Sequence, residues 1–155
     1  MPRRKLREPF TFFVDECLGA EVVPVALRAA VQPDELVVVH RDTFPQGVDD
    51  EVWIEKIALE GWVALTKDAR LRYRPNELAA ILRAEAAVMM VGDGKGEDLA
   101  RALCSALPAM RRALRVHDVP CIARVEKSGA LYVLHADGKP LRPPRLVKAG
   151  PGHRA

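Results

Sequence analysis

Short apolar runs recur along the chain at residues 10–14, 36–40, 62–65 and 87–91. They are rich in valine and phenylalanine, and they do not alternate with polar residues. Continuous runs of this length are typical of strands that are buried on both faces of a sheet. We therefore predict four buried β-strands at these positions.

Helical segments separate the predicted strands. We predict helices over residues 25–31, 50–60, 75–84 and 97–107. Pro24 suits the start of the first helix, and Asp49 and Asp50 suit the start of the second, which Gly61 is expected to end. Pro108 is expected to end or kink the fourth helix, because proline lacks the N–H group that a helix interior needs.

The alternation of strands and helices predicts the fold class. Parallel strands need long crossover connections, and helices of about ten residues provide them. We expect an α/β three-layer sandwich with a mainly parallel central sheet. Residues 121–126 and 130–135 flank the turn-forming triplet Lys127, Ser128 and Gly129, which predicts a C-terminal β-hairpin appended to a sheet edge.

The length of 155 residues fits one compact domain with short additions. We expect a basic N-terminal extension over 1–9, an α/β domain over 10–116 and the hairpin over 117–137. Residues 138–155 contain four prolines, three glycines and five Lys or Arg residues. That composition predicts a disordered basic tail, because it offers few apolar side chains to bury.

Charge is unevenly distributed along the chain. Residues 1–60 carry 7 basic and 12 acidic side chains, whereas residues 61–155 carry 17 and 9. An acidic half beside a basic half suits a divalent metal held next to a polyanion. Arginine supplies 17 of the 24 basic residues, which favours bidentate phosphate contacts, although high-GC codon usage would produce the same bias.

The cysteines and the apolar runs indicate the compartment. Cys17, Cys104 and Cys121 form no CxxC motif and are odd in number, so neither a disulfide framework nor a zinc site is predicted. Asp15 and Glu16 interrupt the first apolar stretch, which argues against a signal-peptide core. No run approaches the roughly 20 apolar residues of a membrane span. We expect a cytoplasmic protein that does not enter a membrane.

Three aspartates are predicted to converge at one edge of the sheet. Asp15 follows the first strand and Asp68 follows the third, so both are expected at the carboxyl edge, where ligands bind in open α/β folds. Asp50 begins the second helix on the stripe that faces the sheet, because Ile54 and Ile57 are its i+4 and i+7 partners. That helix starts at the same edge, which brings the three carboxylates together.

Neighbouring carboxylates repel one another unless a cation neutralises them, and oxygen-rich clusters of this kind usually hold Mg²⁺ or Mn²⁺. Such an ion activates water and stabilises a phosphodiester transition state. Candidates for a fourth ligand or a water-positioning base are Asp93, Glu16, Asp49 and Glu51. Taken one at a time, each aspartate also fits a simpler role as a helix cap or a turn residue.

Cations and an aromatic residue follow the third predicted strand. This segment contains Lys67, Arg70, Arg72, Tyr73 and Arg74. Single-stranded RNA is bound through backbone charge and aromatic faces, so we predict RNA contacts here, with a solvated loop as the alternative. His40, His117 and His135 show no metal-ligand spacing and are expected to be hydrogen-bonded structural residues.

The stretch from Asp50 to Asp68, DEVWIEKIALEGWVALTKD, resembles the signature of PIN-domain nucleases. In that signature an aspartate opens a helix, a glycine ends it, and the next strand finishes in Thr-x-Asp or Thr-x-Asn. Together with FFVDECLG at 12–19 and RYRPNEL at 72–78, the stretch is similar to reduced PIN-like proteins related to the VapC toxins of toxin–antitoxin modules. The resemblance covers residues 10–92.

This resemblance implies an endoribonuclease that depends on Mg²⁺ or Mn²⁺, with an RNA substrate and a cognate antitoxin as partner. The family's acids correspond to Asp15, Asp50 and Asp68, and Thr66 would orient a carboxylate or a water by a hydrogen bond. Larger PIN domains carry an additional helical Glu that has no clear equivalent here.

Our leading hypothesis is therefore a metal-dependent endoribonuclease acting as the toxin of such a module; we also consider a homodimer. The alternative is a non-catalytic RNA-binding or regulatory module of the same fold. A phosphoacceptor receiver domain fits less well, because no aspartate ends a middle strand at a suitable separation.

Overall fold

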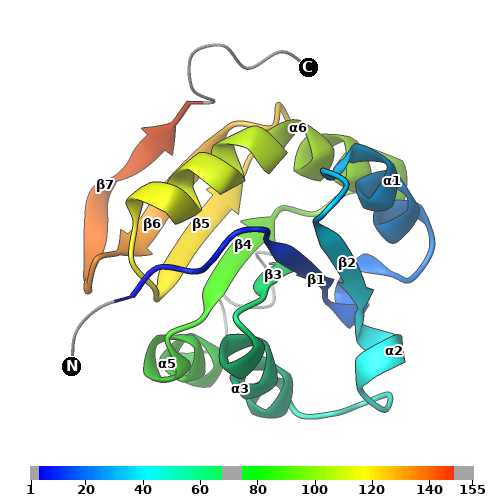
Figure 1. Ribbon diagram of the computed structural model, residues 1–155, viewed down its shortest axis with the longest axis horizontal. Helices are drawn as coiled ribbons and strands as arrows, with labels where there is room; N and C mark the ends of the chain where they lie inside the picture. Colours follow the sequence, from blue (N-terminus) through cyan, green and yellow to red (C-terminus); the bar gives the residue numbers. More distant parts are fainter. Residues whose placement is uncertain (1–3, 68–74, 149–155) are drawn as a thin grey trace.

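A computed structural model describes residues 4–67 and 75–148, in which one sheet lies between two layers of helices (Figure 1). The strands are β1 (Thr11–Val14), β2 (Leu36–Val39), β3 (Val63–Lys67), β4 (Ala87–Val91), β5 (Cys121–Val125), β6 (Leu131–Ala136) and β7 (Lys139–Val147). The helices are the 3-10 helix η1 (Glu16–Leu18) and the α-helices α1 (Val22–Ala30), α2 (His40–Thr43), α3 (Asp50–Glu60), α5 (Pro75–Ala84) and α6 (Gly96–Val116).

The sheet has the strand order β2-β1-β3-β4-β5-β6-β7. The first five strands in this order are parallel, and β6 and β7 are antiparallel to their neighbours. The predicted α/β sandwich with a mainly parallel sheet and a C-terminal hairpin is confirmed. The chain passes from β1 outward to β2 and then returns across β1 to β3. The carboxyl ends of β1 and β3 therefore lie at the topological switch point of the sheet.

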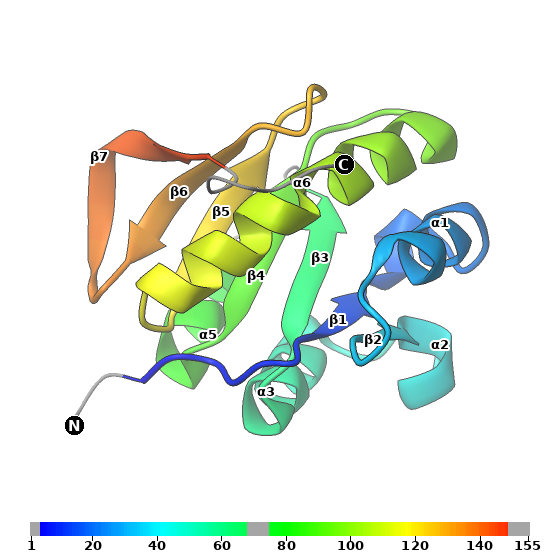
Figure 2. The same ribbon diagram turned by 45° about the horizontal axis from the view of Figure 1, so that its top comes forward.

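Both faces of the sheet are covered. Helices α1 and α6 lie over one face, and α3 and α5 lie over the other, as Figures 1 and 2 show. In β1, Phe12 and Val14 pack with the α1–α6 layer, whereas Phe13 packs with the α3–α5 layer. Successive side chains point to opposite faces, so a strand covered on both sides has to be apolar throughout. This explains the unbroken hydrophobic runs of the sequence.

Strand β2 differs from the doubly buried strand predicted for residues 36–40. It lies at the edge of the sheet, and Leu36 is 62% exposed. His40 begins α2 instead of ending the strand. The apolar run was misleading here. β2 pairs with β1 on one side only, and helices cover only part of its surface, so its side chains are not all buried.

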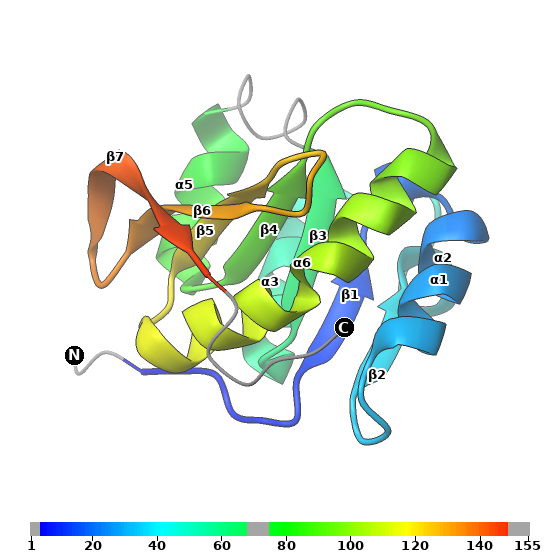
Figure 3. The same ribbon diagram turned by 90° about the horizontal axis from the view of Figure 1, so that it is seen from above.

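Helix α6 continues through Pro108, which was expected to end or kink it at residue 107. On either side of the proline, Leu103, Leu107, Met110 and Leu114 are almost completely buried in the core. Burying each such side chain contributes about 1.5–3 kcal/mol, which together outweigh the lost hydrogen bond at the proline. Figure 3 shows α6 lying along the sheet beside α1.

The β5–β6 hairpin is present as predicted, and its turn packs closely on α6. Gly129 has a φ of +89°, and a Cβ added there would lie 2.5 Å from the Cβ of Ser105. Glycine is therefore required both by its backbone conformation and by its contact with the helix.

Strand β7 corrects the prediction of a disordered tail from residue 138. Residues 139–147 pair with β6 through a turn at Asp137 and Gly138, which both have positive φ. The composition gave no sign of this strand because its order depends on the partner β6, and prolines are tolerated at a sheet edge. Residues 149–155 lie outside the described residues. Within the described ranges, no helix is apolar over a length that could span a bilayer.

Candidate active site

Asp15 lies at the carboxyl end of β1 and is completely buried. Its backbone N–H donates to the carbonyl of Leu65 on β3 at 3.0 Å, and its backbone is extended, with φ −64° and ψ 154°. The alternation of β1 therefore continues, which puts Asp15 on the same face as Phe13, toward α3 and α5. Its Oδ1 accepts a hydrogen bond of 2.7 Å from the N–H of Glu16, at the start of η1.

Among residues 4–67 and 75–148, two side chains donate hydrogen bonds to the other carboxylate oxygen of Asp15. Thr66, near the end of β3, donates from Oγ1 to Asp15 Oδ2 at 2.7 Å, and Cys17 donates from Sγ at 3.3 Å. Burial, together with the charge of Asp15, raises the pKa of the Cys17 thiol to about 11. The sulfur therefore stays protonated at neutral pH and acts as a donor rather than as a thiolate ligand.

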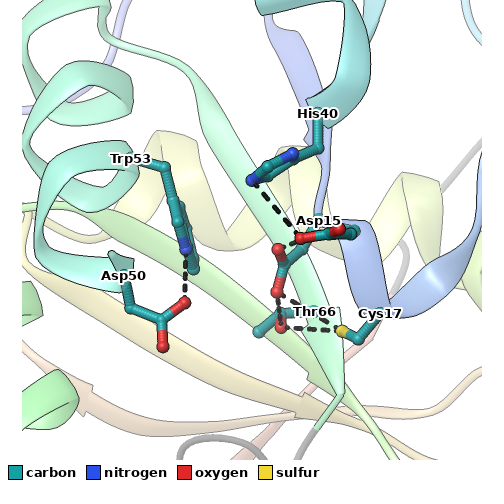
Figure 4. A network of polar contacts seen from close by, with 7 residues as sticks. Asp15, Cys17, His40, Asp50, Trp53 and Thr66 are labelled. Atoms are coloured by element: carbon teal, nitrogen blue, oxygen red, sulfur yellow. Dashed lines mark hydrogen bonds and ion pairs between the residues drawn. The ribbon is translucent and has the colours of Figure 1, made fainter. Parts of the chain in front are cut away.

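Asp50 is the first residue of α3 and is half-buried. Its Oδ1 accepts a hydrogen bond of 2.7 Å from the indole Nε1 of Trp53, one helical turn further on. In Figure 4 the Asp50 carboxylate extends from α3 toward the side on which Asp15 and Thr66 lie. Asp49 holds the N-cap position and makes no side-chain capping hydrogen bond.

An aromatic cluster supports this end of the sheet. Phe13 is its centre, with ring centroids 5.6 Å from Trp53, 5.9 Å from His40, 5.9 Å from Phe44 and 6.3 Å from Trp62. His40 is 3% exposed, and its Nε2 lies 4.0 Å from Oε2 of Glu16. The cluster connects β1, α2 and α3 next to the carboxylates of Asp15 and Asp50.

The four candidates for a further acid lie in different places, and all are exposed. Glu16 is adjacent to Asp15, and Asp49 precedes Asp50. Glu51 lines a shallow pocket between α3 and α5. Asp93 follows β4, the strand next to β3, and lines a pocket with the first turns of α6 and the end of β5.

Several predicted site residues lie outside the described residues. These are Asp68, Arg70, Arg72, Tyr73 and Arg74. Lys67 is described as the partly buried last residue of β3. The structure thus brings Asp15 and Thr66 into contact and puts Asp50 on α3 at the same end of the sheet, while the meeting of Asp15, Asp50 and Asp68 stays a prediction.

The donor set suits a hard divalent ion. Asp15, Asp50 and Thr66 offer carboxylate and hydroxyl oxygens, which Mg²⁺ and Mn²⁺ prefer, and the protonated Cys17 offers no thiolate. Among residues 4–67 and 75–148, no group of three or more His, Cys, Asp or Glu side chains is close enough to hold a metal by itself. A complete site therefore needs a further ligand, such as the predicted Asp68.

Two partners of the acids were not predicted from the sequence. Cys17 lies two residues after Asp15, and Trp53 lies three residues after Asp50. The i+3 spacing could have indicated the second contact, since residues at this spacing are neighbours on a helix surface.

The chain is similar in sequence to known proteins. A family model described as "PIN like domain" matches residues 10–93, which include Asp15, Asp50, Thr66 and Asp68. A protein of Mycobacterium tuberculosis (strain ATCC 25618 / H37Rv), named "Putative ribonuclease VapC45", is 34% identical over 125 residues, covering 79% of this chain and 90% of the relative. No solved structure matches the chain significantly.

Proposed function

The chain belongs to the family of PIN-like domains, and from this premise we propose that it is a metal-dependent endoribonuclease that hydrolyses RNA phosphodiester bonds. The single observation that carries the proposal is the buried Asp15 carboxylate at the sheet's switch point, held by Thr66. The similarity to the protein named "Putative ribonuclease VapC45", 34% identity over 125 residues, supports the same activity.

In this proposal, Asp15, Asp50 and Asp68 hold Mg²⁺ or Mn²⁺. When bound, the ion lowers the pKa of a water ligand and offsets the negative charge that develops on the phosphate. Thr66 fixes the orientation of the Asp15 carboxylate by its hydrogen bond. Exclusion of water around the buried Asp15 strengthens each of these polar contacts.

The chain's cations complete the proposed site. Lys67, Arg70, Arg72 and Arg74 would contact phosphates, and Tyr73 would stack on a base. The likeness to VapC-type toxins supports a cognate antitoxin as the protein partner. Asp93, Glu16, Asp49 and Glu51 stay candidates for a fourth acid; Asp93 follows β4, the strand next to β3.

The Asp15→Asn variant tests the proposal. It keeps the size of the side chain and an acceptor for Thr66, but it removes the negative charge that a metal needs. We expect RNA cleavage stimulated by Mn²⁺ in the wild type and its loss in Asp15→Asn, with a native-like circular dichroism spectrum and cooperative thermal unfolding as the measure of folding. Asp34→Asn, at an exposed aspartate between α1 and β2, is the matched control.

Cleavage that persists in Asp15→Asn would overturn the assignment of this residue. A wild-type protein that binds RNA without cleaving it, at any Mn²⁺ or Mg²⁺ concentration, would instead identify the non-catalytic RNA-binding module.

A further inference from the structure

Trp53 connects the carboxylate of Asp50 to the hydrophobic core. The Trp53 side chain is 1% exposed, and its Nε1 donates to Asp50 Oδ1 at 2.7 Å. An indole has one N–H and no acceptor, so Asp50 takes the whole hydrogen-bonding capacity of this side chain. A hydrogen bond to a charged acceptor is also stronger than one between neutral groups.

The position of the indole is itself fixed by stacking. Its ring lies 5.6 Å from the ring of Phe13 with an interplanar angle of 24°. Phe13 precedes Asp15 by two residues on β1, and both side chains lie on the same face of the sheet. One aromatic contact therefore joins the strand that carries Asp15 to the helix that carries Asp50.

We infer that Trp53 is a positioning residue of the proposed nuclease, whose indole N–H holds the Asp50 carboxylate in the orientation that binds the metal. The inference rests on the proposed function. Rotation about the last bond of an aspartate side chain is soft, so a fixed donor on Oδ1 favours one orientation before the metal arrives. Partners that orient metal ligands in this way are typically worth 10–100-fold in metal affinity or activity.

Trp62 provides a matched comparison within the same cluster. It also stacks on Phe13, with centroids 6.3 Å apart and an interplanar angle of 17°. Within the part of the chain that the structure describes, its indole makes no hydrogen bond to another side chain. Substituting each tryptophan in turn therefore separates the effect of losing an indole ring from the effect of losing the hydrogen bond to Asp50.

The first test compares Trp53→Phe with Trp62→Phe. Both variants keep an aromatic ring against Phe13, and only the first removes the donor to Asp50. We expect Trp53→Phe to weaken Mn²⁺ binding by about 10–100-fold in isothermal titration calorimetry. RNA affinity without metal should be unchanged, and higher Mn²⁺ should restore much of the lost cleavage. Trp62→Phe should stay within about twofold of wild type.

The Asp50→Ala background adds a coupling measurement. The Asp50→Asn side chain would keep an acceptor for Trp53, so the coupling is measured in Asp50→Ala instead. If Trp53 acts through Asp50, the further change Trp53→Phe should alter Mn²⁺ affinity by less than about twofold in the Asp50→Ala background. A full additional loss there would assign the effect of Trp53 to the core instead, and would overturn the inference.

The second test needs no substitution in the core. The chain has two tryptophans, so its NMR spectrum contains two indole N–H signals, which the Trp62→Phe variant assigns. Titration with Mg²⁺, which is diamagnetic, should shift the Trp53 signal more than the Trp62 signal, and Asp50→Asn should abolish the shift. Even where Trp53→Phe does not fold, an unmoved Trp53 signal on Mg²⁺ binding would show that the metal does not engage the carboxylate that Trp53 holds, and would overturn the inference.

The outcomes separate the two proposals. In one outcome the wild type binds Mn²⁺ and cleaves RNA, but Trp53→Phe and Trp62→Phe have equal Mn²⁺ affinity and the Trp53 signal does not shift. That outcome would overturn the role of Trp53 and leave the nuclease proposal intact. A wild type that neither binds Mn²⁺ nor cleaves RNA would overturn the proposed function and this inference together.

Discussion

The hydroxyl of Thr66 stabilises the buried carboxylate of Asp15 by donating a hydrogen bond to it. The Thr66→Val variant keeps the shape of the side chain but removes the hydroxyl donor to Asp15 Oδ2, so that, of the two described donors, only the weak S–H group of Cys17 remains. We expect the free energy of unfolding to fall by about 1.5–3 kcal/mol, since the lost hydrogen bond was made to a charged group. Urea denaturation without metal measures this loss.

The control for this prediction is Thr66→Ser, which keeps the hydroxyl and should recover most of the stability. Equal stability of Thr66→Val and wild type would mean that Asp15 does not depend on this donor.

At the residue scale, the positions of Asp15 and Asp50 were predicted because strand ends and helix starts of a parallel sheet lie at a common edge. The hydrogen bond from Thr66 to a carboxylate was predicted from the resemblance to PIN-domain nucleases. The roles of Cys17 and Trp53 were not predicted, because a hydrogen bond of an apolar or weakly polar side chain depends on its rotamer and on its packing. Spacing could have indicated that Trp53 and Asp50 are neighbours, but it does not show that the indole donates to the carboxylate.

A buried ion pair connects the loop before β2 to α6. Arg111 donates from Nε and Nη2 to the two carboxylate oxygens of Glu35, at 2.9 and 2.8 Å. The two side chains are 8% and 2% exposed. Glu35 also accepts from the backbone N–H of Gln32, so the pair orders the turn as well.

Removing Arg111 should therefore be costly. We expect Arg111→Met to lower the free energy of unfolding by about 3–5 kcal/mol, because it leaves a buried carboxylate without its partner. Adding Glu35→Gln removes that charge and keeps an acceptor for Gln32, so the double variant should be more stable than Arg111→Met alone. Chemical denaturation of the three proteins checks this order, and a double variant less stable than Arg111→Met would contradict it.

At the element scale, helices and strands were predicted best where their own sequence contains residues that mark the start or end of the element. The bounds of β4 and α5 were predicted to the residue, because each is delimited by strong turn or helix-start signals in its own sequence. The end of α6 at residue 107 and the disorder of the segment that forms β7 were predicted wrongly. The observed helix and strand both depend on burial against distant segments, which local propensity does not contain.

For the molecule as a whole, β7 completes the sheet instead of extending away from it. Its pairing with β6 protects a strand that contributes Leu131 and Val133 to the α1–α6 side of the core. Deleting residues 139–155 should therefore lower the melting temperature by about 4–8 °C, which corresponds to about 2 kcal/mol for a chain of this size.

Deleting only residues 149–155, which leaves β7 intact, is the control for that truncation. Equal melting temperatures of the two shortened proteins in differential scanning calorimetry would show that β7 contributes nothing to stability.

Strand β7 also limits how the molecule can polymerise. Pro140, Pro143 and Pro144 supply no N–H, so its outer border cannot template a continuous ladder with another chain. The opposite border, β2, is free of proline and exposes Leu36. Fibril-like stacking of native molecules, if it occurred, would therefore have to start from β2, and a charged residue introduced at position 36 would suppress it.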